Sequence, residues 1–161
     1  MLGAVINSSI YGAELLLIRR ESMPRACLTL DYSDAQRMIS AAETAAVALG
    51  VPYCIAVVDA GGHLLAFARQ DGALIGCIDL ANNKARTARL FDKPTLDLNR
   101  LAQPGADLYG IQQSNGGSVM LIGGGLPVFQ NGAVIGAIGA SAGTVEPDIQ
   151  VAEAALAALP F

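Results

Sequence analysis

Residues 57–73 read VVDAGGHLLAFARQDGA, and residues 123–143 read GGGLPVFQNGAVIGAIGASAG. Each stretch holds two apolar, β-prone runs separated by a two-residue turn, Gly61-Gly62 in the first and Asn131-Gly132 in the second. Gly-Gly and Asn-Gly pairs tolerate the positive φ angles that tight hairpin turns require. Both stretches therefore predict antiparallel hairpins.

The rest of the chain adds helices around these hairpins. Apolar residues recur at helical spacing, and Ser33-Asp34-Ala35-Gln36 predicts a capping box at the start of the first helix. The expected helices are 33–49, 74–91, 95–103 and a last one opened by Thr144 and Pro147, and the expected strands are 53–60, 63–69, 119–122, 126–130 and 133–140. This order predicts a single α+β domain with a largely antiparallel sheet of about five strands, flanked by helices.

The domain is expected to occupy residues 23–161, after an N-terminal extension of residues 1–22. Met23-Pro24 is an alternative start of translation. Within the extension, the apolar run 13–18 is a poor signal peptide because no basic residue precedes it and Arg19 and Arg20 follow it.

Charge is scarce in this sequence. Charged residues make up 15% of the chain and hydrophobic residues 53%, where about 25% and about 45–50% are usual. So little charge cannot cover a monomer, and we expect a homo-oligomer that buries an apolar face. The net charge of −4 and the scattered basic residues argue against a nucleic-acid partner.

Residues 108–145 carry no charge over 38 positions, which is long enough for a membrane helix. Ten glycines and Pro127 lie within this segment, so buried strands explain it better and no membrane partner is expected. The three cysteines, Cys27, Cys54 and Cys77, cannot all pair within one chain and show no C-x-x-C spacing. We therefore expect reduced thiols and a cytoplasmic protein.

Polar residues beside the first hairpin are candidates for a ligand site. Asp59 and Asp71 each follow a strand and lie close to glycine, where a carboxylate either caps the turn or borders a pocket. His63 is the one histidine and can serve as a base or an axial metal ligand, although histidines on hairpins are often surface residues. Arg69 is either a ligand contact or a solvated cation.

Lys84 lies on a helix lined with alanine. A partly buried Lys84 would pair with Asp59, Asp71 or a ligand carboxylate, whereas a solvated Lys84 would do little. In the first case, Lys84→Met should weaken ligand binding at a nearly constant melting temperature. Gly124, in a run of three glycines, either turns backbone N–H groups toward an anion or permits close packing, and no G-K-[ST] follows it as a P-loop would need.

A serine hydrolase is a further interpretation of the same residues. Ser141 in G-A-S-A-G resembles a nucleophile elbow, and His63 and Asp59 would complete a catalytic trio. An elbow belongs in a parallel α/β sheet, whereas hairpin signals precede Ser141 here. The sequence therefore argues against acyl hydrolysis.

Four motifs in this order resemble the GlcG/HbpS family: VVDAGGHLLAFARQDGA, KARTARLF, GGGLPVFQNGAVIGAIGASAG, and Pro147-Asp148 before an alanine-rich helix. The resemblance covers about residues 30–159 and implies one domain with an antiparallel sheet flanked by helices, usually assembled into dimers or higher oligomers. Members of the GlcG/HbpS family include haem-binding and haem-degrading proteins, a domain of PduO-type corrinoid adenosyltransferases, and proteins encoded beside glycolate-oxidation and other catabolic enzymes. The matching positions are Asp59, Gly61, Gly62, Arg69, Asp71, Gly72, Lys84, Thr87, Gly124, Pro127, Gly136, Gly139, Ser141 and Asp148.

The sequence departs from the family pattern at two places. Haem-binding relatives can use a histidine on the first helix as iron ligand, and residues 33–49 contain none, which leaves His63 as the metal ligand if haem binds. Ala142 stands where the family commonly has the second glycine of its S-G signature.

Three functions are compatible with these residues and this resemblance. The first is a small-molecule-binding accessory protein of a catabolic pathway, which takes haem or another planar or carboxylated ligand. The second is an enzyme of the lyase, isomerase or tautomerase type that uses Asp59, Asp71 or Lys84 as acid or base on a small organic acid. The third is a structural oligomer or assembly partner. The expected ligand-binding residues are Asp59, His63, Arg69, Asp71, Lys84 and Gly124.

Overall fold

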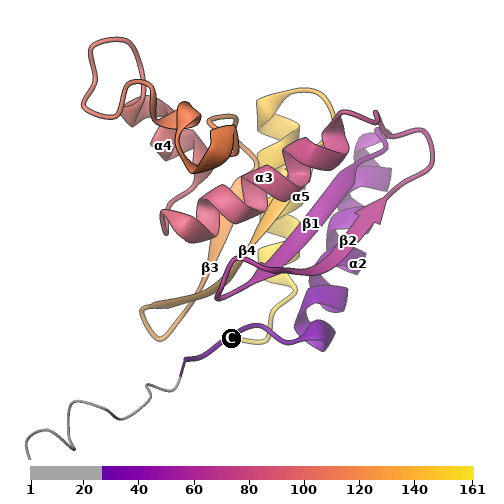
Figure 1. The fold of residues 1–161 in the computed structure, drawn as a ribbon. Coiled ribbons are helices and arrows are strands. Elements are labelled where there is room, and N and C mark those ends of the chain that lie inside the picture. Colours follow the sequence, from indigo (N-terminus) through magenta and orange to yellow (C-terminus); the bar gives the residue numbers. More distant parts are fainter. Residues whose placement is uncertain (1–26) are drawn as a thin grey trace, which may run out of the picture.

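The computed structural model describes residues 27–161, so the expected N-terminal extension, 1–22, lies outside the described residues (Figure 1). The elements follow in the order α2 (Tyr32–Leu49), β1 (Cys54–Asp59), β2 (Leu64–Arg69), α3 (Cys77–Leu90), α4 (Thr95–Leu101), the 3₁₀ turns η1 (Ile111–Gln113) and η2 (Asn115–Gly117), β3 (Gly125–Gln130), β4 (Ala133–Ser141) and α5 (Val145–Ala157). One antiparallel sheet lies between α3 on one face and α2 with α5 on the other. The α+β class is confirmed.

The sheet joins the two hairpins that the sequence predicts. Its strand order is β2-β1-β4-β3, and all three neighbouring pairs are antiparallel. Asn131 and Gly132 have φ angles of 52° and 78°, as a tight turn between β3 and β4 requires. In the centre, Cys54 pairs with Ser141 and Asp59 pairs with Gly136. The two ends of β1 therefore lie at opposite rims of the sheet.

Helix α2 begins one residue before the expected capping box. The N-cap is Asp31, whose side chain accepts the backbone N–H of Asp34 at 2.8 Å, while the Asp34 carboxylate accepts the N–H of Asp31 at 3.3 Å. The reciprocal arrangement is the predicted motif, but it uses two aspartates instead of Ser33 and Gln36. The buried face of the helix packs on the sheet through small residues and one methionine, namely Ala35, Met38, Ala42 and Ala46.

Helix α3 packs against the sheet with its backbone close to β4. Three of its six buried residues, Ala81, Ala85 and Ala88, are alanines, and all three are fully covered. A side chain at Gly139 of β4 would overlap the backbone of Ala81 and Ala85, so only glycine allows this approach. The absence of a side chain at this point of β4 sets the distance between α3 and the sheet.

Residues 119–122, expected as a fifth strand, are not one: the segment is irregular. Side chains from two helices satisfy its backbone in place of a neighbouring strand. The hydroxyl of Thr87 on α3 accepts the N–H of Met120 at 2.9 Å, and the hydroxyl of Thr95 on α4 donates to the carbonyl of Ile122 at 2.7 Å. An apolar run alone does not reveal such partners, which come from distant parts of the chain.

The segment that carries α4, η1 and η2 projects from one corner of the molecule (Figure 1). Leu101 and Tyr109 are exposed on it. Among residues 27–161, no helix is both long and apolar enough to span a bilayer.

Candidate functional site

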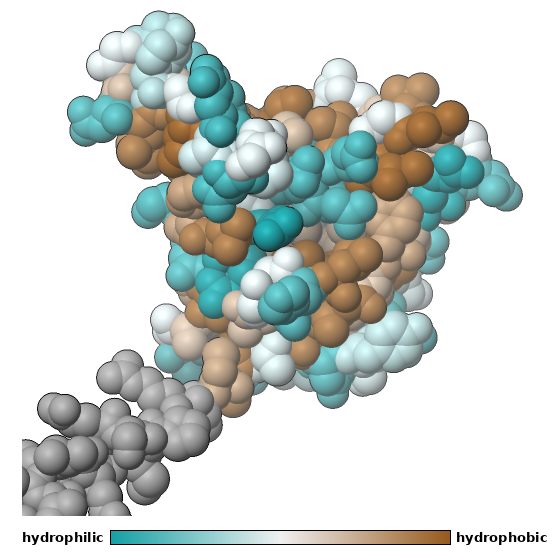
Figure 2. Space-filling model, in the orientation of Figure 1, coloured by the Kyte–Doolittle hydropathy of each residue, from teal (hydrophilic) through white to brown (hydrophobic). Residues whose placement is uncertain are grey.

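A cleft of about 350 Å³ opens between the β1–β2 turn and α3. Figure 2 shows this side of the molecule, where hydrophilic and hydrophobic residues are interspersed. Polar residues from the two elements line the cleft. Its walls are formed by Val58, Gly61, Gly62, His63, Leu64, Asn82, Asn83 and Arg86.

Asp59 builds the turn at the edge of this cleft. One of its carboxylate oxygens, Oδ1, accepts the backbone N–H groups of Gly61 at 2.8 Å and His63 at 2.9 Å. Gly62 has a φ of 77°, a conformation that favours glycine. Partial burial raises the pKa of Asp59, but these N–H donors outweigh it and hold the pKa below its ordinary value. Asp59 therefore caps the turn as a carboxylate, which is one of the two roles expected from the sequence.

His63 stands at the mouth of the cleft with its side chain 83% exposed. Its Nδ1 atom lies 3.4 Å from Oδ1 of Asp59. The ring also lies over Gly61, since a β-carbon there would come within 2.6 Å of Nδ1 and 2.7 Å of Cε1. Gly61 leaves room for the ring, and the Asp59 carboxylate lies beside Nδ1, so Nε2 is the nitrogen without this contact.

Helix α3 supplies the opposite wall. Asn82 and Arg86 are one helical turn apart and so share a face. Arg86 is exposed, and among residues 27–161 it takes part in no ion pair. Its guanidinium is therefore available for a carboxylate, which arginine binds in a bidentate manner. Arg86, Asn82 and Asn83 are not among the ligand-binding residues predicted from the sequence, although their helical spacing opposite the alanine face is a usable signal.

Arg69 and Asp71 lie at the other end of the first hairpin. Arg69 pairs with Cys54, the first residue of β1, whereas Asp59 is the last. The rise of roughly 3.3 Å per residue puts the two ends roughly 17 Å apart. Asp71 borders a separate depression of about 240 Å³ beside Val51 and Pro52. The structure therefore does not bring Asp59 and Asp71 together.

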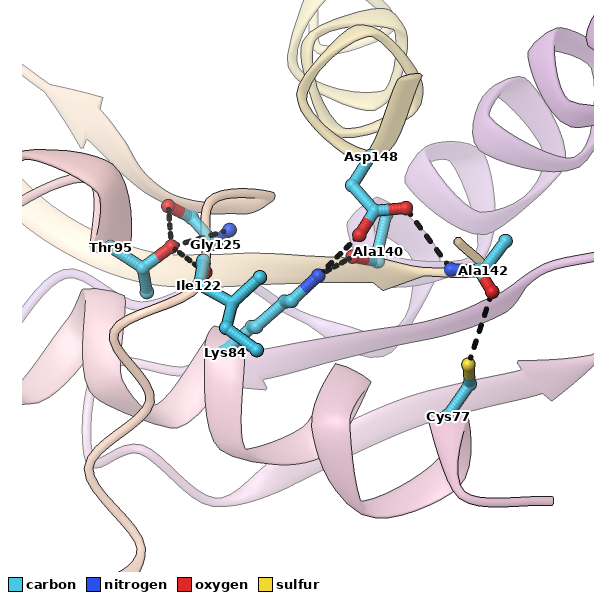
Figure 3. A network of polar contacts seen from close by, with 8 residues as sticks. All are labelled: Cys77, Lys84, Thr95, Ile122, Gly125, Ala140, Ala142 and Asp148. Atoms are coloured by element: carbon cyan, nitrogen blue, oxygen red, sulfur yellow. Dashed lines mark hydrogen bonds and ion pairs between the residues drawn. The ribbon is translucent and has the colours of Figure 1, made fainter. Parts of the chain in front are cut away.

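Lys84 does not line the cleft, because it points from α3 into the protein interior and is fully buried (Figure 3). Its Nζ donates to Oδ2 of Asp148 at 2.5 Å and to the carbonyl of Ala140 at 2.9 Å. The other carboxylate oxygen of Asp148 accepts the N–H of Ala142 at 3.0 Å. Burial lowers the pKa of Lys84, against the opposing effect of the Asp148 carboxylate. Asp148 therefore takes the place of the partners predicted from the sequence, which are Asp59, Asp71 or a ligand carboxylate.

Gly124 is buried between these groups. It has a φ of 103°, and a β-carbon there would come within 2.7 Å of the Asp148 side chain and 2.8 Å of the Ala140 carbonyl. The next residue, Gly125, donates its N–H to Thr95 at 3.0 Å. Close packing, one of the two interpretations of the glycine run, accounts for these positions.

Ser141 is buried at the end of β4, opposite Cys54. His63 follows the far end of β1, so the serine and the imidazole lie at opposite rims of the sheet. The sheet is also antiparallel throughout, unlike the parallel sheet in which a nucleophile elbow is found. The structure therefore does not assemble Ser141, His63 and Asp59 into a trio.

The model of the family described as "Haem degrading protein HbpS-like" matches residues 30–157, which is nearly all of the described part of the chain. The chain belongs to the HbpS-like family. This confirms the resemblance seen in the sequence motifs. The match includes the first hairpin, α3 and the Lys84–Asp148 pair.

Relatives of this HbpS-like chain include an uncharacterised 15.0 kDa protein from the dhaT-dhaS intergenic region of Citrobacter freundii, 44% identical over 80% of this chain and 90% of that protein. The corrinoid adenosyltransferase PduO of the same organism is 35% identical over 90% of this chain, which spans only 43% of PduO. Among solved structures, the PduOC:heme complex has a TM-score of 0.80 and 36% identity, with coverage of 83% of this chain and 96% of that one.

Proposed function

We propose that this protein binds a small carboxylated ligand, haem or a similar planar metal-bearing molecule, in the cleft between the β1–β2 turn and α3. The observation that carries the proposal is the joint presence in one cleft of an oriented imidazole, His63, and of Arg86, which forms no ion pair within the described part of the chain. The HbpS-like family and the solved PduOC:heme complex support haem as the class of ligand.

The residues of the cleft fit such a ligand. Nδ1 of His63 faces the carboxylate of Asp59, so Nε2 is the nitrogen that remains for a metal, and histidines that bind metals usually have such a partner on the other nitrogen. Arg86, with Asn82 and Asn83 beside it, supplies hydrogen-bond donors for a carboxylate. The chain has one histidine, so His63 is its one imidazole and α2 has none to serve as iron ligand. A bound haem would bring redox and oxygen chemistry that the side chains lack.

Titration of haem into the protein tests the proposal. We expect a Soret band characteristic of histidine ligation, which His63→Ala should remove. Arg86→Ala should weaken binding roughly 10–100-fold, as loss of a charge-assisted hydrogen bond of about 1.5–3 kcal/mol does. Arg100→Ala, an exposed arginine outside the cleft, is the matched control and should bind as the unchanged protein does.

Two results would contradict the proposal. One is a protein that gains no Soret band, and the other is an unchanged histidine-type spectrum in His63→Ala.

A groove between α2 and β2, lined by Tyr32 and Phe67 among others, offers aromatic side chains to a planar ligand. A spectrum altered by Tyr32→Phe and not by His63→Ala would move the ligand to that groove.

We also propose an accessory role in a catabolic pathway. The names of two relatives, a corrinoid adenosyltransferase and a protein from the dhaT-dhaS intergenic region, support a setting beside enzymes of small-molecule metabolism. Deletion of the gene should then slow growth on carbon sources whose breakdown requires corrinoid, and normal growth on all of them would contradict the role.

A further inference from the structure

One carboxylate oxygen of Asp59 contacts both the backbone and the ring of His63. Oδ1 accepts the backbone N–H of His63 at 2.9 Å and lies 3.4 Å from Nδ1 of its ring. The same atom accepts the N–H of Gly61, the residue over which the ring lies. The turn and the ring orientation therefore depend on one carboxylate.

The tautomer of a neutral imidazole decides which nitrogen can bind a metal. One nitrogen carries a proton and donates, and the other keeps its lone pair and accepts. A carboxylate beside Nδ1 stabilises the form with the proton on Nδ1, because that form alone offers it a donor. The lone pair then lies on Nε2, which faces away from the turn. Since the ring is 83% exposed, little else holds it in this state.

The geometry points to Asp59 as the positioning residue of the site: it holds His63 in the Nδ1–H tautomer and so presents the lone pair of Nε2 to the metal of a ligand in the cleft. This inference rests on the proposed function for its ligand. Its statement about the imidazole can be tested on the protein alone. No atom of Asp59 is required to touch the ligand.

Nitrogen NMR measures the tautomer directly, and a chain with one histidine gives one imidazole spectrum. The measurement is made at an alkaline pH at which the nitrogen chemical shifts themselves show a neutral ring. The unchanged protein should show mainly the Nδ1–H form. The population should shift toward Nε2–H in Asp59→Asn, which keeps an oxygen to accept the turn N–H groups, and further in Asp59→Ala, which keeps none.

Affinity for haem should follow the tautomer. Loss of a group that orients a metal ligand typically weakens binding roughly 10–100-fold, so we expect a loss of this size in Asp59→Asn with the melting temperature changed far less than in Asp59→Ala. Asp71→Asn changes the equivalent aspartate at the other end of the hairpin and should leave both tautomer and affinity unchanged.

The outcomes separate this inference from the proposed function. An unchanged protein with the proton on Nε2 overturns the role of Asp59. So does the finding that Asp59→Asn and Asp59→Ala both keep the tautomer and the affinity of the unchanged protein. If His63→Ala then still abolishes the Soret band, the proposed function stands without it. Conversely, the tautomer could shift in Asp59→Asn while no variant affects haem binding. That result would support the effect of Asp59 on the His63 tautomer and would contradict haem binding in this cleft.

Discussion

Lys84 and Asp148 form an ion pair with side chains only 1% and 3% exposed. Removal of one member of such a pair leaves the other charge buried without a partner, which costs about 3–5 kcal/mol. We therefore expect Lys84→Met to unfold at a clearly lower temperature or urea concentration, contrary to the nearly constant melting temperature expected if Lys84 held a ligand. The control is Lys93→Met at the other lysine of the chain, which is exposed.

A second variant separates the lost charge from lost packing. Asp148→Asn keeps an oxygen that can accept the N–H of Ala142, so Lys84→Met combined with Asp148→Asn should recover part of the stability. A double variant less stable than Lys84→Met alone would show that the carboxylate does more than neutralise the lysine.

Tyr53 gives the protein a sensitivity to alkaline pH. Burial, and then the nearby Asp148 carboxylate, raise the pKa of Tyr53 well above the ordinary value of 10.0. The folded state therefore keeps this proton at a pH where the unfolded state has lost it, so stability that is present below pH 10.0 falls as the pH rises further.

Tyr53→Phe should make this alkaline loss of stability less steep, as measured by urea unfolding above pH 10.0. The buried thiol of Cys54, whose pKa burial also raises, contributes equally to both proteins and cancels in the comparison. Tyr109→Phe changes an exposed tyrosine and should behave as the unchanged protein does. Equal steepness in all three proteins would contradict the assignment to Tyr53.

The sequence predicts single residues well where a local pattern decides their role. Asp59 caps its turn because a short carboxylate beside glycine reaches the next N–H groups. The partner of Lys84 was not predictable from a local pattern, because Asp148 lies on another helix. Helical spacing also does not show how deeply a lysine side chain is buried. Arg86 was not predictable from the hairpin motif, because it lies on the helix that faces the hairpin across the cleft.

At the level of elements, Gly139 permits the contact between α3 and β4. We expect Gly139→Ala to push α3 from the sheet and to destabilise the fold by about 1–3 kcal/mol or more, because backbone atoms of Ala81 and Ala85 cannot move aside as a side chain would. Gly143→Ala, just after the same strand, meets no atom within 4 Å and is the matched control. Equal melting temperatures for the two variants would contradict this account.

Elements with their own start and stop signals were predictable. The Asn131-Gly132 turn fixed one hairpin, and α2 ends at Gly50 with a φ of 70°, as a helix-terminating glycine does. Residues 119–122 were not predictable, because their hydrogen bonds come from Thr87 and Thr95 on separate helices. Apolar composition indicates that such a segment is buried, but it does not show which elements bury it.

For the whole molecule, scarce charge and exposed apolar side chains predict self-association. Leu74 and Ile75, on the loop before α3, are 65% and 76% exposed. Light scattering at micromolar concentration should therefore give a particle larger than the 16.5 kDa chain. Ile75→Glu should reduce its mass, whereas Leu101→Glu, on the projecting α4, serves as the control for an added charge. A particle of 16.5 kDa for the unchanged protein would contradict the prediction.

The central strands β1 and β4 come from distant parts of the chain, as the pairing of Cys54 with Ser141 shows. The two outer strand pairs close over short turns, whereas the central pair closes a loop of roughly 90 residues, at an entropic cost that rises with the logarithm of loop length. Non-local pairings of this kind slow folding. The two hairpins should therefore form early, and their meeting should set the refolding rate.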